Sequence, residues 1–264
     1  MSQQNYQTEI KKAISQNPCT KSLIEVNIEN LPADSYAKHY RQLGNGTAIL
    51  DTAEQLNLYL AAYGDMHQEK LIQALNSLFA NKNLNDKQAE VIDWGCGQAF
   101  ASCVLLDYIN QNKIDIDLSK FILIEPSKLA LQRGLEHIEA ISQRVPKPTT
   151  FAINEKADSN LLLGNNKKSS NIKIHLFSNL LDIHTLSLDK VFHNVVNNFT
   201  GENYFVCVSP INASRLDSFY KMFKTKDYIS INGSSINMEI FRPSAMKRVH
   251  KSVSRIEYIF KVNL

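Results

Sequence analysis

Short apolar runs alternate with longer amphipathic stretches between residues 91 and 223. The runs predict five β-strands, at residues 91–92, 121–124, 150–153, 172–177 and 204–208. The stretches between them predict helices, at about residues 99–112, 126–141, a segment leading to 196, and 216–223. Strands that alternate with helices form βαβ units, so the pattern predicts a mostly parallel sheet.

Two later runs, at residues 238–241 and 256–262, alternate between apolar and polar positions and predict strands that pair antiparallel at the end of the sheet. The expected fold class is therefore α/β, with a doubly wound, mostly parallel sheet and an antiparallel edge strand. The chain before residue 81 has a helical pattern instead. We accordingly expect a mostly helical N-terminal cap at residues 1–80 and a sheet domain at residues 81–264.

Within the helical region, Tyr6, Ile10 and Ile14 recur at a four-residue interval and predict a first helix. Residues 22–28 alternate and are interpreted as a short strand, and residues 32–42 as a short helix. Thr52 and Gln55 form a capping-box pattern, which predicts a helix over 53–63. Gly64 is expected to break or kink that helix before a second one over 66–79.

Composition excludes few functions. The 264 residues carry a net charge of +3 and are 44% hydrophobic, which suits a globular core and favours no particular partner. No apolar run approaches the ~20 residues needed to span a bilayer, and residues 1–16 contain no apolar secretory segment. The four cysteines have no metal-ligand spacing, so we expect a cytoplasmic protein with no membrane segment and no metal site.

Basic residues gather near the C-terminus with few acids among them. Their simplest interpretation is a solvated face beside edge strands, and the alternative is a contact with RNA or another phosphate-bearing substrate. The residues are Lys221, Lys224, Lys226, Arg242, Lys247, Arg248, Lys251, Arg255 and Lys261.

The best-defined chemical signal is the segment Asp93-Trp94-Gly95-Cys96-Gly97-Gln98-Ala99, where a strand must turn abruptly into a helix. Gly95 permits a tight turn, and Gly97 allows the backbone to approach a ligand closely. Asp93, ahead of the glycines, suits a cationic amino group better than a pyrophosphate. Ala99 stands where a dinucleotide fingerprint has its third glycine, so both features favour a nucleoside with an amino-acid tail over NAD.

Glu125 ends the next predicted strand, where a carboxylate can accept both hydroxyls of a ribose. Together, Asp93, Gly95, Gly97 and Glu125 resemble the first two motifs of class I S-adenosylmethionine-dependent methyltransferases. The resemblance extends in element order over about residues 90–262 and is specific at these two loops. It implies that S-adenosyl-L-methionine is the cofactor and that Cys96 belongs to its binding turn.

The resemblance also implies that the loop after the third strand contacts the adenine. Asn154, Glu155 and Asp158 are the candidates there, and we select Asp158. The loop after the fourth strand contains Ser178 and Asn179, where substrate or the methionine tail is expected. Asn179 is equally interpretable as the cap of the following helix.

This fourth-strand loop departs from the Asn/Asp-Pro-Pro-aromatic motif of the enzymes that methylate amino groups of DNA bases. That departure argues against amino methylation of bases by the same mechanism. Asp182 and His184 follow in the loop and are interpreted as surface residues rather than a general base pair.

Tyr59, Tyr63, His67 and Lys70 recur at three- to four-residue spacing and are expected to share a helix face. Tyr63 and His67 are candidates for a lid over the cofactor. The alternative is a packed helix–sheet interface with the polar tips outward. Trp94 is expected to pack beneath the cofactor turn or beside the adenosine.

The sequence therefore favours a methyltransferase whose acceptor is RNA, a protein or a small molecule. The basic C-terminal residues slightly favour a phosphorylated acceptor such as RNA. The alternative is a methyltransferase-like binding or assembly module without turnover, for example in a larger complex or a defence system. A nicotinamide-dependent oxidoreductase is disfavoured by Asp93 and Ala99. The sequence assigns no catalytic residue and no oligomeric state.

Overall fold

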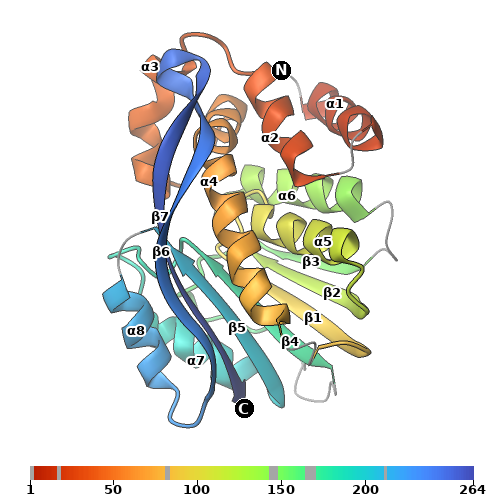
Figure 1. Cartoon of the computed structure of the whole chain (residues 1–264), viewed down its shortest axis with the longest axis vertical. Coiled ribbons are helices and arrows are strands. Elements are labelled where there is room, and N and C mark those ends of the chain that lie inside the picture. The colour runs from red at the N-terminus through yellow and green to blue at the C-terminus, as the bar shows by residue number, and fades with distance from the viewer. Residues whose placement is uncertain (1–2, 17–18, 81–83, 143–147, 164–170, 211–212) are drawn as a thin grey trace.

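The computed structural model describes residues 3–16, 19–80, 84–142, 148–163, 171–210 and 213–264. Its centre is a seven-stranded sheet in the order β3-β2-β1-β4-β5-β7-β6 (Figure 1). The strands β1 (Lys87–Trp94), β2 (Ile116–Ile124), β3 (Thr149–Ile153), β4 (Ile172–Ser178) and β5 (Glu202–Ser209) are parallel. The strands β6 (Asp227–Arg242) and β7 (Lys247–Asn263) are antiparallel to each other, and β7 is antiparallel to β5. The predicted doubly wound sheet with an antiparallel edge is confirmed.

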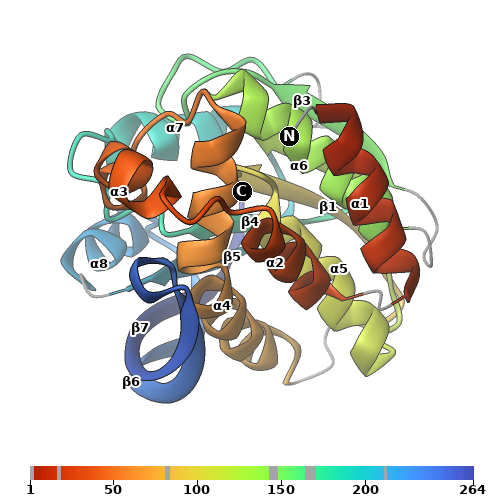
Figure 2. The same cartoon turned by 90° about the horizontal axis from the view of Figure 1, so that it is seen from above.

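Helices cover both faces of the sheet because its central strands, β1, β4 and β5, are buried on both sides. One face packs against α4 (Ala53–Phe79), α5 (Phe100–Asn112) and α6 (Lys128–Ile141), with α1 (Gln3–Gln16) and α2 (Thr20–Glu29) outside them (Figures 1 and 2). The other face packs against α7 (Leu188–Asn198) and α8 (Ala213–Met222). Side chains from α1, α2 and α4 join the same buried cluster as β1 and β2, so the N-terminal helices share a core with the sheet.

The segment interpreted as a strand at residues 22–28 is instead part of α2, so that prediction was wrong. Both the backbone N–H and the hydroxyl of Thr20 donate to one carboxylate oxygen of Asp107 on α5, at 2.8 and 2.7 Å, and fix the start of the helix. Leu23, Ile24 and Val26 are then buried together. Short apolar runs do not distinguish strand from helix, and packing against α4 and α5 decided this one.

The expected break at Gly64 was also wrong, because α4 runs through it as one continuous helix. A Cβ at residue 64 would lie 2.9 Å from Cγ1 of Ile24, so the glycine lets α2 pack closely on α4 rather than ending the helix. The predicted capping box is confirmed: the Thr52 hydroxyl accepts from the N–H of Gln55 at 3.2 Å, and Gln55 accepts from the N–H of Thr52 at 3.2 Å.

In place of the helix expected over 32–42, the structure has a shorter helix, α3 (Ser35–His39), followed by a 3-10 segment, η1 (Tyr40–Gly46). Gly44, Asn45 and Gly46 all have positive φ, which turns the chain back toward the sheet. This turn delivers residues 46–50 to the carboxyl ends of the strands, where the candidate site lies.

The closing hairpin is much longer than the two short runs predicted. β6 and β7 have 16 and 17 residues, and Figure 1 shows them as a ribbon that extends past the sheet and alongside α4. Arg248 of β7 forms ion pairs with Asp65 on α4, at 3.0 Å, and with Glu25 on α2. The carboxylate of Asp65 also accepts from the N–H of Phe241, at 2.8 Å, which fastens the hairpin to α4. Among the described residues, no helix is long and apolar enough to cross a membrane.

Candidate functional site

The turn after β1 is held by backbone geometry that ordinary residues rarely adopt. Gly95, Gly97 and Ala99 all have positive φ, at 62°, 54° and 54°. The N–H of Cys96 donates to the carbonyl of Ile124 at 3.0 Å, and the N–H of Ala99 donates to the carbonyl of Cys96 at 2.8 Å. The turn is thereby attached to the end of β2, next to the point where the strand order reverses between β1 and β4. Ligands of open α/β sheets bind at such a point.

The two glycines have different roles. A Cβ at Gly95 would lie 2.7 Å from Cδ1 of Leu180, so Gly95 makes room for the loop after β4. A Cβ at Gly97 would meet no atom within 4 Å, because Gly97 borders open space. Gly97 therefore has the position expected of a glycine whose missing Cβ leaves space for a ligand.

That open space is a cavity of about 280 Å³, which we call the turn cavity. Gly95, Gly97 and Glu125 line it, together with residues 46–50, which we call the cover and which contribute the apolar side chains of Ala48, Ile49 and Leu50. Ser127 fastens this cover, because its hydroxyl donates to the carbonyl of Leu50. The remaining lining residues include Leu56, Tyr59, Lys156, Ala157, Asp158, Ser178, Asn179, Ile183, Thr185 and Leu186.

Glu125 is fixed in place by the backbone at the rim of the turn cavity. One carboxylate oxygen accepts from the N–H of Gly97 at 2.9 Å, and the other accepts from the N–H of Ser127 at 2.8 Å. Burial raises the pKa of Glu125, and these two hydrogen bonds oppose the rise. Each carboxylate oxygen accepts more than one hydrogen bond, so both can still bind a ligand hydroxyl.

Asp93 and Cys96 were expected at the cofactor, yet neither lines this cavity. One carboxylate oxygen of Asp93 accepts from the N–H and the hydroxyl of Ser102, at 3.2 and 2.7 Å, so it satisfies the start of α5. Burial raises the pKa of Asp93 to about 7, with Glu125 adding to the effect. Cys96 is buried, and burial raises the pKa of its thiol well above the usual value.

Trp94 was expected beneath the cofactor turn or beside the adenosine, and its ring lies in the core on the other face of the sheet. Its ring stacks on Phe177 at 5.6 Å, and its Nε1–H donates to Nδ1 of His175 at 3.1 Å. The opposite ring nitrogen of His175 faces the side-chain oxygen of Asn203 at 3.0 Å. Successive side chains of a strand point to opposite faces, so Trp94 points away from the face that Asp93 and the turn share with α5.

Two of the three adenine candidates lie off the cavity. The Asn154 amide donates to the carbonyls of Glu125 and Pro126, and Glu155 is exposed. Asp158 lines the cavity, and one of its carboxylate oxygens accepts from the N–H of Ser187 at 3.1 Å. Lys156 lines it as well and was not singled out in the sequence.

Ser178 and Asn179 line the turn cavity, as their position after β4 indicated. Asn179 has a φ of +55° and does not cap α7, whose cap is Ser187. Its amide donates to the Ser178 hydroxyl at 3.1 Å, and its Oδ1 is buried and accepts no hydrogen bond from the described residues. An unsatisfied buried acceptor is costly, so this oxygen is suited to a ligand donor.

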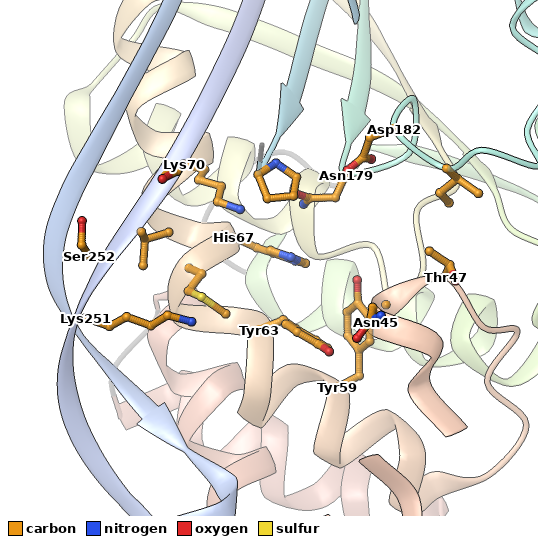
Figure 3. Close-up of a pocket in the computed structure, with 16 residues that line it drawn as sticks. Asn45, Thr47, Tyr59, Tyr63, His67, Lys70, Asn179, Asp182, Lys251 and Ser252 are labelled. Atoms are coloured by element: carbon orange, nitrogen blue, oxygen red, sulfur yellow. The ribbon is translucent and has the colours of Figure 1, made fainter. Parts of the chain in front are cut away.

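A second cavity of about 300 Å³ adjoins the first, and we call it the lysine cavity (Figure 3). The face of α4 predicted from the sequence lines it, with Tyr59, Tyr63, His67 and Lys70. Asp182 lines it from the loop after β4, whereas His184 is exposed and outside both cavities. Residues 251–254 of β7 close its far side. Lys251 is one of the C-terminal basic residues noted in the sequence, but no local signal placed this strand beside α4.

The two cavities meet at shared residues. Gly46, Thr47, Tyr59, Asn179 and Ile183 line both. Tyr59 and Asn179 thus stand between a space bordered by the glycine turn and a space bordered by two lysines. This arrangement can hold two ligands whose reactive atoms meet at Asn179.

Comparison with known proteins identified no family model and no curated protein that matches the sequence. Solved structures with a similar course of the chain include magnesium protoporphyrin IX methyltransferase from Synechocystis PCC 6803 with bound S-adenosylmethionine. It is 10% identical, with a TM-score of 0.42, over 87% of this chain and 97% of that one.

A precorrin-6y C5,15-methyltransferase from Geobacter metallireducens GS-15 is 12% identical, with a TM-score of 0.46, over 74% of this chain and 88% of that one. The tRNA (m1A58) methyltransferase TrmI from Aquifex aeolicus is 11% identical, with a TM-score of 0.40, over 75% of this chain and 69% of that one. In this chain, five parallel strands are followed by a closing antiparallel pair, as the sequence predicted. The fold class is therefore α/β, with a doubly wound, mostly parallel sheet and an antiparallel edge strand.

Proposed function

We propose that this chain is a methyltransferase that binds S-adenosyl-L-methionine in the turn cavity and a small-molecule acceptor in the lysine cavity. The observation that carries the proposal is the junction of the two cavities at Tyr59 and Asn179. A group-transfer enzyme needs its two substrates held with their reacting atoms adjacent. Here one space adjoins a nucleotide-type turn and the other adjoins a separate set of polar side chains.

The turn cavity fits the nucleoside part of the donor. Glu125 would accept from the two ribose hydroxyls, and Gly97 leaves the backbone open beside it. Asp158 and the apolar cover at residues 48–50 would hold the adenine. Ser178 and Asn179 would contact the methionine tail or the acceptor.

When bound, S-adenosylmethionine supplies a methyl group on a sulfonium, which an acceptor lone pair can take while the bonding electrons stay on sulfur. The chain must then orient the acceptor and exclude water. The unpaired Oδ1 of Asn179 would accept a hydrogen bond from the acceptor's N–H or O–H and so direct its lone pair toward the junction. Asp182, whose Oδ1 is also buried and has no hydrogen-bond partner among the described residues, would receive the displaced proton.

Charge supports a small acceptor over RNA. Several C-terminal basic residues are engaged in ion pairs, as in Lys221–Asp217, Arg255–Glu257 and Lys261–Glu202. Arg248 is held by Glu25 and Asp65. A phosphate backbone needs cations that are free to bind it. We also propose a cytoplasmic location, because all four cysteines are unpaired thiols.

One observation favours the alternative, a module that binds the nucleoside without turnover. The carboxylate of Asp93 faces Ser102, so it does not offer the donor's amino group the contact that the sequence suggested. Binding with no transfer to any acceptor would support this alternative.

Calorimetric titration with S-adenosylmethionine and S-adenosylhomocysteine, with NAD as control, tests the proposal. Glu125→Gln should weaken binding of both sulfur nucleosides by about 10- to 100-fold, the range for a charged hydrogen bond. Glu155→Gln makes the same change at an exposed position outside both cavities and should leave binding unchanged. If wild type binds neither nucleoside, or if both variants bind alike, the turn cavity is not the donor site.

A further inference from the structure

Lys70 is a largely buried cation that forms no ion pair with the described residues. Its side chain lies on α4 and lines the lysine cavity, and the residue is only 4% exposed. It makes no hydrogen bond or ion pair with any residue that the structure describes. Burial lowers the pKa of Lys70 to about 8, with Asp182 opposing the shift and Lys251 adding to it. A largely desolvated ammonium is costly, and this one lines the cavity, where a ligand can pair with it.

A second ammonium enters the same cavity from the opposite wall. Figure 3 shows Lys251 of β7 extending toward Tyr63 while Lys70 extends from α4. Asp182 is the single carboxylate among the described residues that line the cavity, and it forms no ion pair with either lysine at 4.0 Å or less. The two lysines and Asp182 give the cavity a net charge of +1, which a ligand with one negative charge would neutralise.

The wall between the lysines and Asn179 is aromatic and uncharged. The rings of Tyr63 and His67 stack at 5.9 Å with an angle of 12°, and Tyr59 contacts both edge-on. Burial lowers the pKa of His67 to about 3, with Lys70 adding to the shift, so the imidazole is neutral at pH 7. Such a surface suits a flat, apolar ring.

At the other end of the cavity the protein offers acceptors without donors. The buried Oδ1 atoms of Asn179 and Asp182 accept no hydrogen bond from the described residues. Both belong to the loop after β4, beside the junction with the turn cavity. A ligand that places a hydroxyl or amino group there would satisfy them.

We infer that the lysine cavity binds a planar aromatic anion, with its oxyanion between Lys70 and Lys251 and its hydroxyl or amino group at Asn179 and Asp182. This inference rests on the proposed function in one respect, namely that the hydroxyl or amino group at Asn179 and Asp182 is the group that receives the methyl. The binding itself needs no methyl donor. The oxyanion is a carboxylate or a phosphate, and the two are separated by experiment.

The experiment titrates the full chain, without methyl donor, with 4-hydroxybenzoate, with 4-hydroxyphenyl phosphate and with neutral 4-hydroxybenzamide at pH 7. At least one anion should bind about tenfold or more tightly than the amide, since a charged hydrogen bond is worth about 1.5–3 kcal/mol. Preference for 4-hydroxybenzoate identifies a carboxylate site, and preference for 4-hydroxyphenyl phosphate a phosphate site. Equal binding of the amide, or no binding of either anion, overturns the inference.

Variants locate the site. Lys70→Met and Lys251→Gln should each weaken anion binding by about tenfold or more. Lys247→Gln is the matched control, because it makes the same change on the same strand at an exposed residue outside the cavity. Loss in all three variants, or in neither cavity variant, contradicts the inference. Titration with S-adenosylmethionine in parallel separates the claims: anion binding without nucleoside binding overturns only the proposed function, and the reverse overturns only this inference.

Discussion

Replacing Lys70 with methionine should make the protein more stable. Lys70 is 4% exposed and has no partner among the described residues, so the native state carries a desolvated charge that the unfolded chain hydrates. Methionine has a similar length and no charge, and it fills irregular space without strain. If Lys70 stabilised the folded state instead, this substitution would destabilise the protein.

The magnitude follows from the pKa of Lys70, which burial lowers from 10.5 to about 8. Each pKa unit corresponds to about 1.4 kcal/mol, so keeping Lys70 charged at pH 7 costs the native state about 3 kcal/mol. Because the native pKa is the lower one, the cost is complete below pH 8 and disappears as the pH rises toward 10.5. Lys70→Met should therefore gain about 3 kcal/mol at pH 7 and about 2 kcal/mol at pH 9.

Urea unfolding followed by circular dichroism at pH 7 and pH 9 measures this gain. A gain of about 3 kcal/mol would also raise the melting temperature by about 6–12 °C in a protein of this size. Lys247→Met, at an exposed residue of β7, should change stability by less than about 0.5 kcal/mol. If Lys70→Met destabilises the protein at pH 7, or if its gain is equal at both pH values, Lys70 is not the unbalanced cation that we describe.

Two other substitutions test the turn and its acid. Gly97→Val should abolish nucleoside binding in calorimetry, because the valine side chain enters open space in the turn cavity. Gly95→Ala should mainly lower the melting temperature, because its Cβ displaces Leu180. Retained nucleoside binding in Gly97→Val would contradict this difference between the two glycines. Asp93→Asn should stabilise the protein more at pH 8 than at pH 5. A carboxyl whose native pKa is raised from 3.8 to about 7 begins to cost stability above pH 3.8, where the unfolded chain ionises, and the cost is complete only above pH 7. Urea unfolding at the two pH values checks the difference, and equal effects would argue against it.

Local signals in the sequence predicted the sheet and the turn. The strand before Gly95, the helix after Ala99 and the acid at Glu125 depend on neighbours in the chain, and the structure brings Gly97 and Glu125 into contact. The positive φ values at Gly95 and Gly97 are likewise a local demand that glycine meets. These features follow from short-range sterics, so one sequence was enough to find them.

Side-chain direction was decided by packing. Asp93 and Trp94 are adjacent in the sequence, but Asp93 bonds to Ser102 at the start of α5 and Trp94 stacks on Phe177 on the other face of the sheet. Which group satisfies a buried carboxylate depends on the helix that packs beside it. The pattern of apolar and polar residues does not predict which helix that is.

The sequence by itself determined that Tyr59, Tyr63, His67 and Lys70 share one face of a helix, because helical periodicity is a local property. It did not determine what that face meets. Residues 251–254 approach it only because the β6–β7 hairpin extends past the sheet and is fastened to α4 through Asp65. The tertiary structure thus converted a helix face into the wall of a cavity, since a cavity exists only between surfaces that distant parts of the chain bring together.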